Sequence, residues 1–148
     1  MPAHLFRNII VSAVRPFYNN TSRFNYMSNT NEITKTSKIK FDVNLDKENL
    51  PVSIHWEADD ADIEGKQEAK AMILSLWDGL QQNALRIDLW TKEMNVEEMN
   101  LFLFQTIATL ADTFERSTDN SEVAEEIREF AHQLGHKLNV FGPDHKHE

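Results

Sequence analysis

Apolar and polar positions alternate in two neighbouring segments, which is the pattern of half-buried β-strands. The apolar positions are Ile39, Phe41, Val43 and Leu45 in the first segment and Val52, Ile54 and Trp56 in the second. Between them, residues 46–49 have the composition of a turn, and Pro51 suits the first position of a strand. The pattern therefore predicts an antiparallel hairpin.

A helical stripe follows in residues 64–80. Its apolar positions are Ala69, Met72, Ile73, Leu76, Trp77 and Leu80. Because they recur three and four residues apart, they predict a helix with one buried face, with the acids of 57–64 near its positive end. Residues 85–90 alternate again and predict a third strand, with Leu85, Ile87 and Leu89 on one face.

The next predicted helix begins at Asn95, since Glu98 three residues later completes a capping box. It carries two apolar faces. One consists of Met99, Phe102, Leu103, Thr106, Leu110 and Phe114, and the other of Leu101, Phe104, Ala108 and Ala111. A helix with two apolar faces needs two covers. The last helix, with its stripe Val123, Ile127, Phe130, Leu134 and Leu138 and a stop at 142–143, is the expected second cover, and a homodimer interface is the alternative.

The element order β-β-α-β-α-α predicts an α+β fold. We expect a two-layer domain over residues 38–142, with a small, mainly antiparallel three-stranded sheet and helices packed on one face. Residues 1–37 are expected to form a disordered leader and residues 143–148 a flexible tail. Within the leader, residues 1–26 contain three arginines and no acid. Met27 is the expected true start, and a flexible arm or a targeting segment is the alternative.

Charge and composition narrow the function classes. The 148 residues carry a formal charge of -9, from 24 acidic and 15 basic side chains. Such an excess of acids disfavours nucleic acid and anionic membranes as partners. No apolar run reaches the roughly 18 residues that span a bilayer. The chain has no cysteine, which excludes disulfides and thiolate zinc sites and fits a reducing cytoplasm. We therefore expect a soluble, acidic, cytoplasmic protein.

Candidate catalytic and metal-binding patterns are incomplete. His132 and His136 are four residues apart with Glu129 near them, but the chain lacks HExxH, and a solvated helix face explains the pair. Residues 60–65 imitate the start of a calcium loop, yet its twelfth position is Ala71 where such loops have a glutamate. With four glycines in the chain, a glycine-rich phosphate loop is not expected. We expect no catalytic residue, no metal, no cofactor and no enzymatic activity.

One predicted surface has the composition of a protein-binding site. Arg86, Asp88 and Trp90 share the outer face of the third strand, and an aromatic residue flanked by charges is typical of interface hot spots. Local packing of Trp90 over the sheet edge is the alternative. Leu101 and Phe104, on the second face of the 95–118 helix, are the other candidates for partner binding.

Five segments carry a family resemblance. They are KIKFDVNL (38–45), HWEADDA (55–61), EGKQEAKAMILSLWD (64–78), LRIDLWTKEM (85–94) and QTIATLADTFERST (105–118). Together they resemble the gliding-motility-associated protein GldC over residues 36–141. The resemblance implies a small accessory protein of the gliding apparatus that is linked to type IX secretion, without assigned catalysis or cofactor.

We therefore predict a non-catalytic protein that supports gliding by binding protein components of that apparatus. One alternative is a metal-dependent or other enzyme that uses His132, His136 and nearby acids. Another is a chaperone-like binder of apolar client segments.

Overall fold

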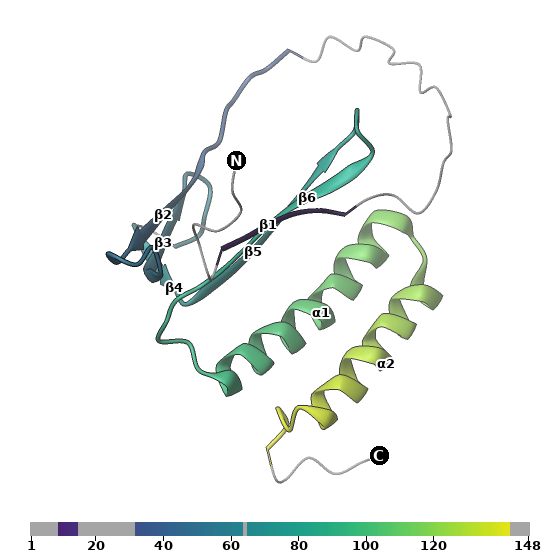
Figure 1. The fold of residues 1–148 in the computed structure, drawn as a ribbon. Coiled ribbons are helices and arrows are strands. Elements are labelled where there is room, and N and C mark those ends of the chain that lie inside the picture. The colour runs from purple at the N-terminus through teal and green to yellow at the C-terminus, as the bar shows by residue number, and fades with distance from the viewer. Residues whose placement is uncertain (1–8, 15–31, 64, 143–148) are drawn as a thin grey trace. The chain divides into compact units, whose positions relative to one another are not determined.

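The computed structural model describes residues 9–14, 32–63 and 65–142. The chain divides into two compact units, Met1–Glu93 and Met94–Glu148. The first contains the strands and the second the helices (Figure 1), and we call them the sheet unit and the helical unit. The predicted domain 38–142 spans both, and its limits stay a prediction.

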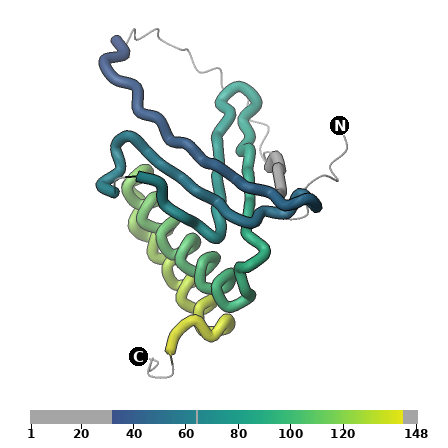
Figure 2. Tube along the Cα trace, turned by 90° about the vertical axis from the view of Figure 1, so that its left-hand side faces the viewer, coloured from purple at the N-terminus to yellow at the C-terminus, as the bar shows by residue number. Residues whose placement is uncertain are grey.

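The sheet unit is an antiparallel meander with one additional strand. The meander runs through β2 (Ile39–Leu45), β3 (Pro51–Ala58), β4 (Gln67–Ala69), β5 (Ala71–Asp78) and β6 (Asn83–Trp90). Two sheets have the orders β2-β3-β4 and β1-β6-β5. Lys70 alone separates β4 from β5, so one extended segment belongs to both sheets, and β2 and β3 run across the direction of the β5–β6 hairpin (Figure 2).

The predicted hairpin of β2 and β3 is confirmed, with Phe41 opposite Trp56 and Val43 opposite Ile54. Its turn is held by the Asp46 carboxylate, which accepts hydrogen bonds from the backbone N–H groups of Leu50 at 3.0 Å and Glu48 at 2.9 Å. These hydrogen bonds, of which the one from the Leu50 N–H has the largest effect, lower the pKa of the Asp46 carboxyl group. Ile54 is fully buried.

The predicted helix over 64–80 is wrong, because this segment forms β4 and β5. Its backbone pairs with β3 on one side, where Ile54 lies opposite Ala69, and with β6 on the other, where Leu85 lies opposite Leu76. Inter-strand pairing outweighs the local helical spacing of the apolar residues. The small α+β class with antiparallel sheets is confirmed, whereas the order β-β-α-β-α-α is wrong: in the described residues, six strands precede two helices.

A part of the predicted disordered leader forms a strand. β1 (Ile9–Val14) pairs antiparallel with β6 in a continuous register from Ile9 opposite Leu89 to Val14 opposite Ala84. The predictions for residues 1–8, 15–31 and 143–148 lie outside the described residues. The proposed start at Met27 stays a prediction.

The helical unit consists of α1 (Val96–Thr118) and α2 (Ser121–Lys137). The predicted capping box is confirmed, since Glu98 N–H donates to Asn95 Oδ1 at 2.8 Å and Asn95 N–H donates to Glu98 Oε2 at 3.0 Å. α2 ends before the predicted stop at 142–143. Asn139 adopts φ 53°, which turns the chain so that Val140 N–H donates to the Gly135 carbonyl at 3.1 Å.

Small side chains form the seam between α1 and α2. Ala111, Ala124, Ala131 and Gly135 are buried there. A Cβ added at Gly135 would lie 2.6 Å from the Phe141 ring and 2.9 Å from the Phe104 ring. α2 therefore covers part of the second apolar face of α1, as predicted. The predicted stripe of large residues on α2 contributes less than expected, because Phe130 is exposed.

Gly135→Val tests this seam. The two branches on the valine Cβ cannot swing away from the Phe104 and Phe141 rings, so we expect a loss of about 1–3 kcal/mol in the free energy of unfolding. The measurement is chemical denaturation followed by circular dichroism. Gly142→Val is the matched control, because an added Cβ there meets no atom within 4 Å. Equal losses in both variants would contradict the close approach of the helices.

Candidate functional site

The β5–β6 hairpin extends beyond the rest of the sheet unit (Figure 1) and ends in large apolar side chains. Trp77 is 69% exposed, Leu80 in the turn is 90% exposed, and the cross-strand pair Leu76 and Leu85 is 53% and 42% exposed. We call these four residues the hairpin tip. Near the other end of β6, Leu89 is 4% exposed. Within the β5–β6 hairpin, the exposed large apolar side chains are therefore concentrated at the tip.

The turn that builds the tip is specified locally. The Asp78 carboxylate accepts hydrogen bonds from the backbone N–H groups of Leu80 at 2.8 Å and Gln81 at 3.0 Å. Gln82 adopts φ 49°, the left-handed conformation that closes such turns. With the backbone satisfied by Asp78, the leucine side chain at position 80 is presented outward.

The three predicted residues of the sheet surface lie on one face of the hairpin. Arg86, Asp88 and Trp90 alternate along β6. Ala84 lies two residues before Arg86 on β6 and therefore on the same face of the sheet. Trp77 lies directly opposite Ala84 on β5, so its side chain is on this face as well. We call Trp77, Arg86, Asp88 and Trp90 the hairpin face.

The charges of the hairpin face neutralise each other. Arg86 Nε lies 2.8 Å from Asp88 Oδ1, and the Asp88 side chain is the less exposed of the two. Trp90 is half-buried, and both partner binding and local packing over the sheet edge stay predictions for it. Trp77 is thus the principal aromatic residue of this face, and a partner would meet an apolar surface with a compensated ion pair.

The other two candidates belong to the helical unit. The Phe104 ring meets the Phe141 ring edge-on, with centroids 5.2 Å apart, and it is half-buried within the helix seam. Leu101 is exposed. Phe104 therefore packs within the helix seam, whereas Leu101 is accessible to a partner.

His132 and His136 take part in an aromatic cluster. Their Nε2 atoms lie 3.3 Å apart, and the Phe141 ring centroid is 5.3 Å and 4.8 Å from the two imidazoles. His132 is exposed and His136 is half-buried, so the predicted solvated helix face fits His132 better than His136. Within the described residues, no three His, Asp or Glu side chains gather in a way that could hold a metal ion.

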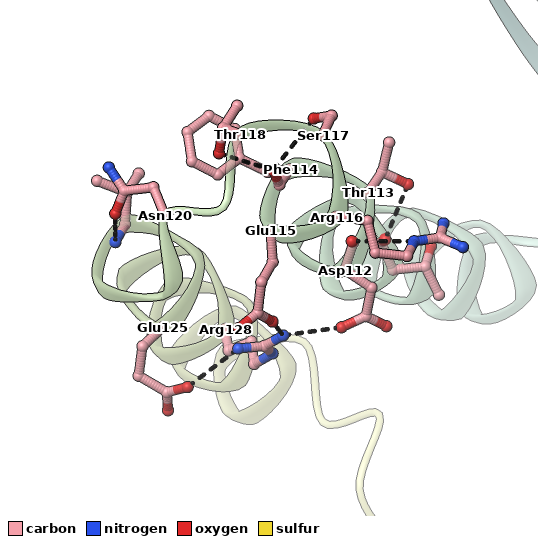
Figure 3. A network of polar contacts seen from close by, with 12 residues as sticks. Asp112, Thr113, Phe114, Glu115, Arg116, Ser117, Thr118, Asn120, Glu125 and Arg128 are labelled. Carbon is pink, nitrogen blue, oxygen red and sulfur yellow. Dashed lines mark hydrogen bonds and ion pairs between the residues drawn. The ribbon is translucent and has the colours of Figure 1, made fainter.

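The carboxylates of the helices form a structural network. Arg128 of α2 binds Glu115 and, at 3.0 Å, Asp112 of α1, and it reaches Glu125 of its own helix at 3.2 Å (Figure 3). Hydrogen bonds to these carboxylates, of which the one to Glu115 has the largest effect, raise the pKa of the Arg128 guanidinium. The network therefore ties α1 to α2.

The acidic segment between β3 and β4 has a similar, structural role. Asp60, the first residue of the calcium-like pattern, pairs with Lys35, whose hydrogen bond lowers the Asp60 pKa. Since β4 follows and not a helix, the expected placement of these acids at a helix N-terminus is wrong.

A second apolar surface lies on the β2-β3-β4 sheet. It forms a hollow of about 350 Å³ lined by Ile39, Phe41, Ile54, Trp56, Ala58, Ala69, Ala71 and Met72. The side chains on the opposite face of the same strands include charged ones. Lys40 Nζ lies 3.2 Å from Asp42 Oδ2 and 3.5 Å from Glu57 Oε1. The sheet therefore has one apolar and one charged face.

Fold and surface together define a small α+β protein that presents a tryptophan and three leucines on an extended β-hairpin. In the described part of the chain, neither helix combines the length and apolarity needed to cross a membrane. The family model described as gliding motility-associated protein GldC-like matches residues 51–140. The chain belongs to this family, which associates it with gliding motility and confirms the resemblance seen in the sequence. Neither a curated protein nor a solved structure matched the chain.

The hairpin tip was not predicted from the sequence. The predicted helix placed Leu76, Trp77 and Leu80 on its buried face, and the structure exposes all three. The available signal was the Asp78-Gly79 pair between two apolar runs, which is a strong hairpin signal.

Trp77→Ala tests the exposed position of the indole. Because Trp77 has few contacts to lose, we expect the free energy of unfolding to change by about 0.5 kcal/mol or less. Ile54→Ala, at a fully buried position of the same unit, should cost about 2–5 kcal/mol. Chemical denaturation of both variants makes the comparison. A larger loss for Trp77→Ala than for Ile54→Ala would instead support the buried helix face.

Proposed function

We propose that this protein is a non-catalytic, cytoplasmic accessory protein of gliding motility, which acts by binding protein components of the gliding and type IX secretion apparatus. The hairpin tip and the hairpin face form the contact surface. One observation carries the proposal: Trp77 is 69% exposed on an extended hairpin in a member of a gliding-associated family.

The composition of this surface supports protein binding. Tryptophan and arginine are the residue types most enriched in interface hot spots. Burying a large apolar side chain against a partner contributes about 1.5–3 kcal/mol. The Arg86–Asp88 pair supplies hydrogen-bonding groups next to Trp77 without adding net charge. A protein partner can use both contributions.

The two alternative functions stay predictions. An enzyme or metal-dependent protein would use His132, His136 and nearby acids, and metal analysis of untagged protein with and without His132→Ala tests that activity. A chaperone-like binder of apolar segments would use the hollow on the β2-β3-β4 sheet. Binding of an apolar dye to the native protein, compared with a Phe41→Ser variant, tests that binding.

Deletion of the gene in its gliding host tests the proposed function. We expect single-cell gliding to be impaired and to be restored by the unaltered chain. A Trp77→Ala, Leu80→Ala chain should restore it poorly, because loss of a hot spot costs about 2 kcal/mol or more, roughly 30-fold in the dissociation constant. Gliding speed and colony spreading are the measurements.

Leu110→Ala is the matched control, since Leu110 is a similarly exposed leucine in the helical unit. Immunoblots establish that all chains accumulate to the same level. Normal gliding in the deletion strain would contradict the proposed function. Full restoration by the Trp77→Ala, Leu80→Ala chain would place the contact surface elsewhere.

A further inference from the structure

Within the meander, β6 has one neighbouring strand, β5, so its outer edge is available to a further strand. β5 occupies the inner edge, from Ala71 opposite Trp90 to Asp78 opposite Asn83. On the outer edge lies β1, which is not part of the meander and is separated from β2 by residues 15–38. Without β1, the backbone N–H and C=O groups along this edge would be open to another strand.

β1 and β6 also differ in their relation to the family. β6 lies within the matched residues 51–140, and β1 lies outside them. The accepting edge is therefore built from residues that the family model matches, whereas β1, like β2, lies outside that match.

The β6 edge accepts six consecutive residues in unbroken antiparallel register. The segment seated there, IIVSAV, has no charge and is rich in β-branched residues. The edge thus suits an uncharged extended strand.

From these observations we propose that the outer edge of β6 is a strand-addition site. Its ligand is an extended, uncharged segment of a protein partner that is rich in β-branched residues. β1 holds the site in cis, and the partner segment takes its place. The site runs along the hairpin face, so a bound strand would lie beside Arg86 and Asp88. The inference deepens the proposed function and relies on it for the existence of a partner.

A free peptide of residues 6–16 serves as the probe, with the full chain as receptor. In the unaltered chain, β1 competes from within at an effective concentration on the order of millimolar. Ile10→Pro with Val11→Pro releases the edge, since successive N–H groups point to opposite sides and one of the two prolines removes a ladder bond. We expect this variant to bind the labelled peptide at least about tenfold more tightly than the unaltered chain.

Two measurements report the result. Fluorescence anisotropy gives the dissociation constant, and hydrogen exchange follows the amides of residues 84–89. The proline variant should exchange faster there, and the peptide should restore the protection. Ile10→Val with Val11→Ile is the matched control and should behave as the unaltered chain. Equal binding by all three chains, or equal binding of a peptide that carries the two prolines, would overturn the proposal.

The single variants Ile10→Pro and Val11→Pro keep the test decisive if the double variant does not fold. Because one of them removes an N–H that points to β6 and the other does not, their affinities for the peptide should differ. Equal affinities would overturn the proposal.

The outcome is separable from that of the gliding experiment. Tight peptide binding together with normal gliding in the deletion strain would establish the edge and refute the proposed function. Absent peptide binding together with impaired gliding would leave the function standing and refute this site.

Discussion

The pairing of one extended segment with two neighbours is the constraint on which the sheet unit depends. β4 pairs with β3 and β5 pairs with β6, although Lys70 alone lies between them. Two backbone hydrogen bonds fix the junction: Thr91 N–H donates to the Lys70 carbonyl at 2.8 Å, and Lys92 N–H to the Pro51 carbonyl at 3.0 Å. This junction lets the β5–β6 hairpin extend with an apolar tip, and it leaves the outer edge of β6 for β1.

The helical unit is stabilised by different interactions. A seam of alanines and Gly135 allows α1 and α2 to approach closely, and the bulky Phe104 and Phe141 rings close its end. Arg128 joins the two helices through three carboxylates, which gives the acidic surface a structural use. The unit therefore uses Phe104 and Phe141 for packing, whereas the hairpin presents Trp77 to solvent.

How far the sequence predicted the structure depends on whether the signal was local. The capping box of Asn95 and Glu98 depends on four consecutive residues and was predicted in full. The alternation in 85–90 correctly placed Arg86 and Asp88 on one face. The stripe from Ala69 to Leu80 fitted a helix equally well, and pairing with residues outside the stripe, on the neighbouring strands β3 and β6, decided against it. The same non-local origin hid the exposure of Trp77 and the partners of Arg128.

The central claim is that a protein partner contacts the β5–β6 hairpin in gliding cells. The most direct measurement places a photo-reactive amino acid at position 77 and, as a control, at position 110 of the chain in those cells. The account predicts a covalent adduct with a discrete protein at position 77, absent at position 110 and reduced when Leu80 is replaced by alanine. Absence of an adduct at position 77, or the same adduct at both positions, would contradict it.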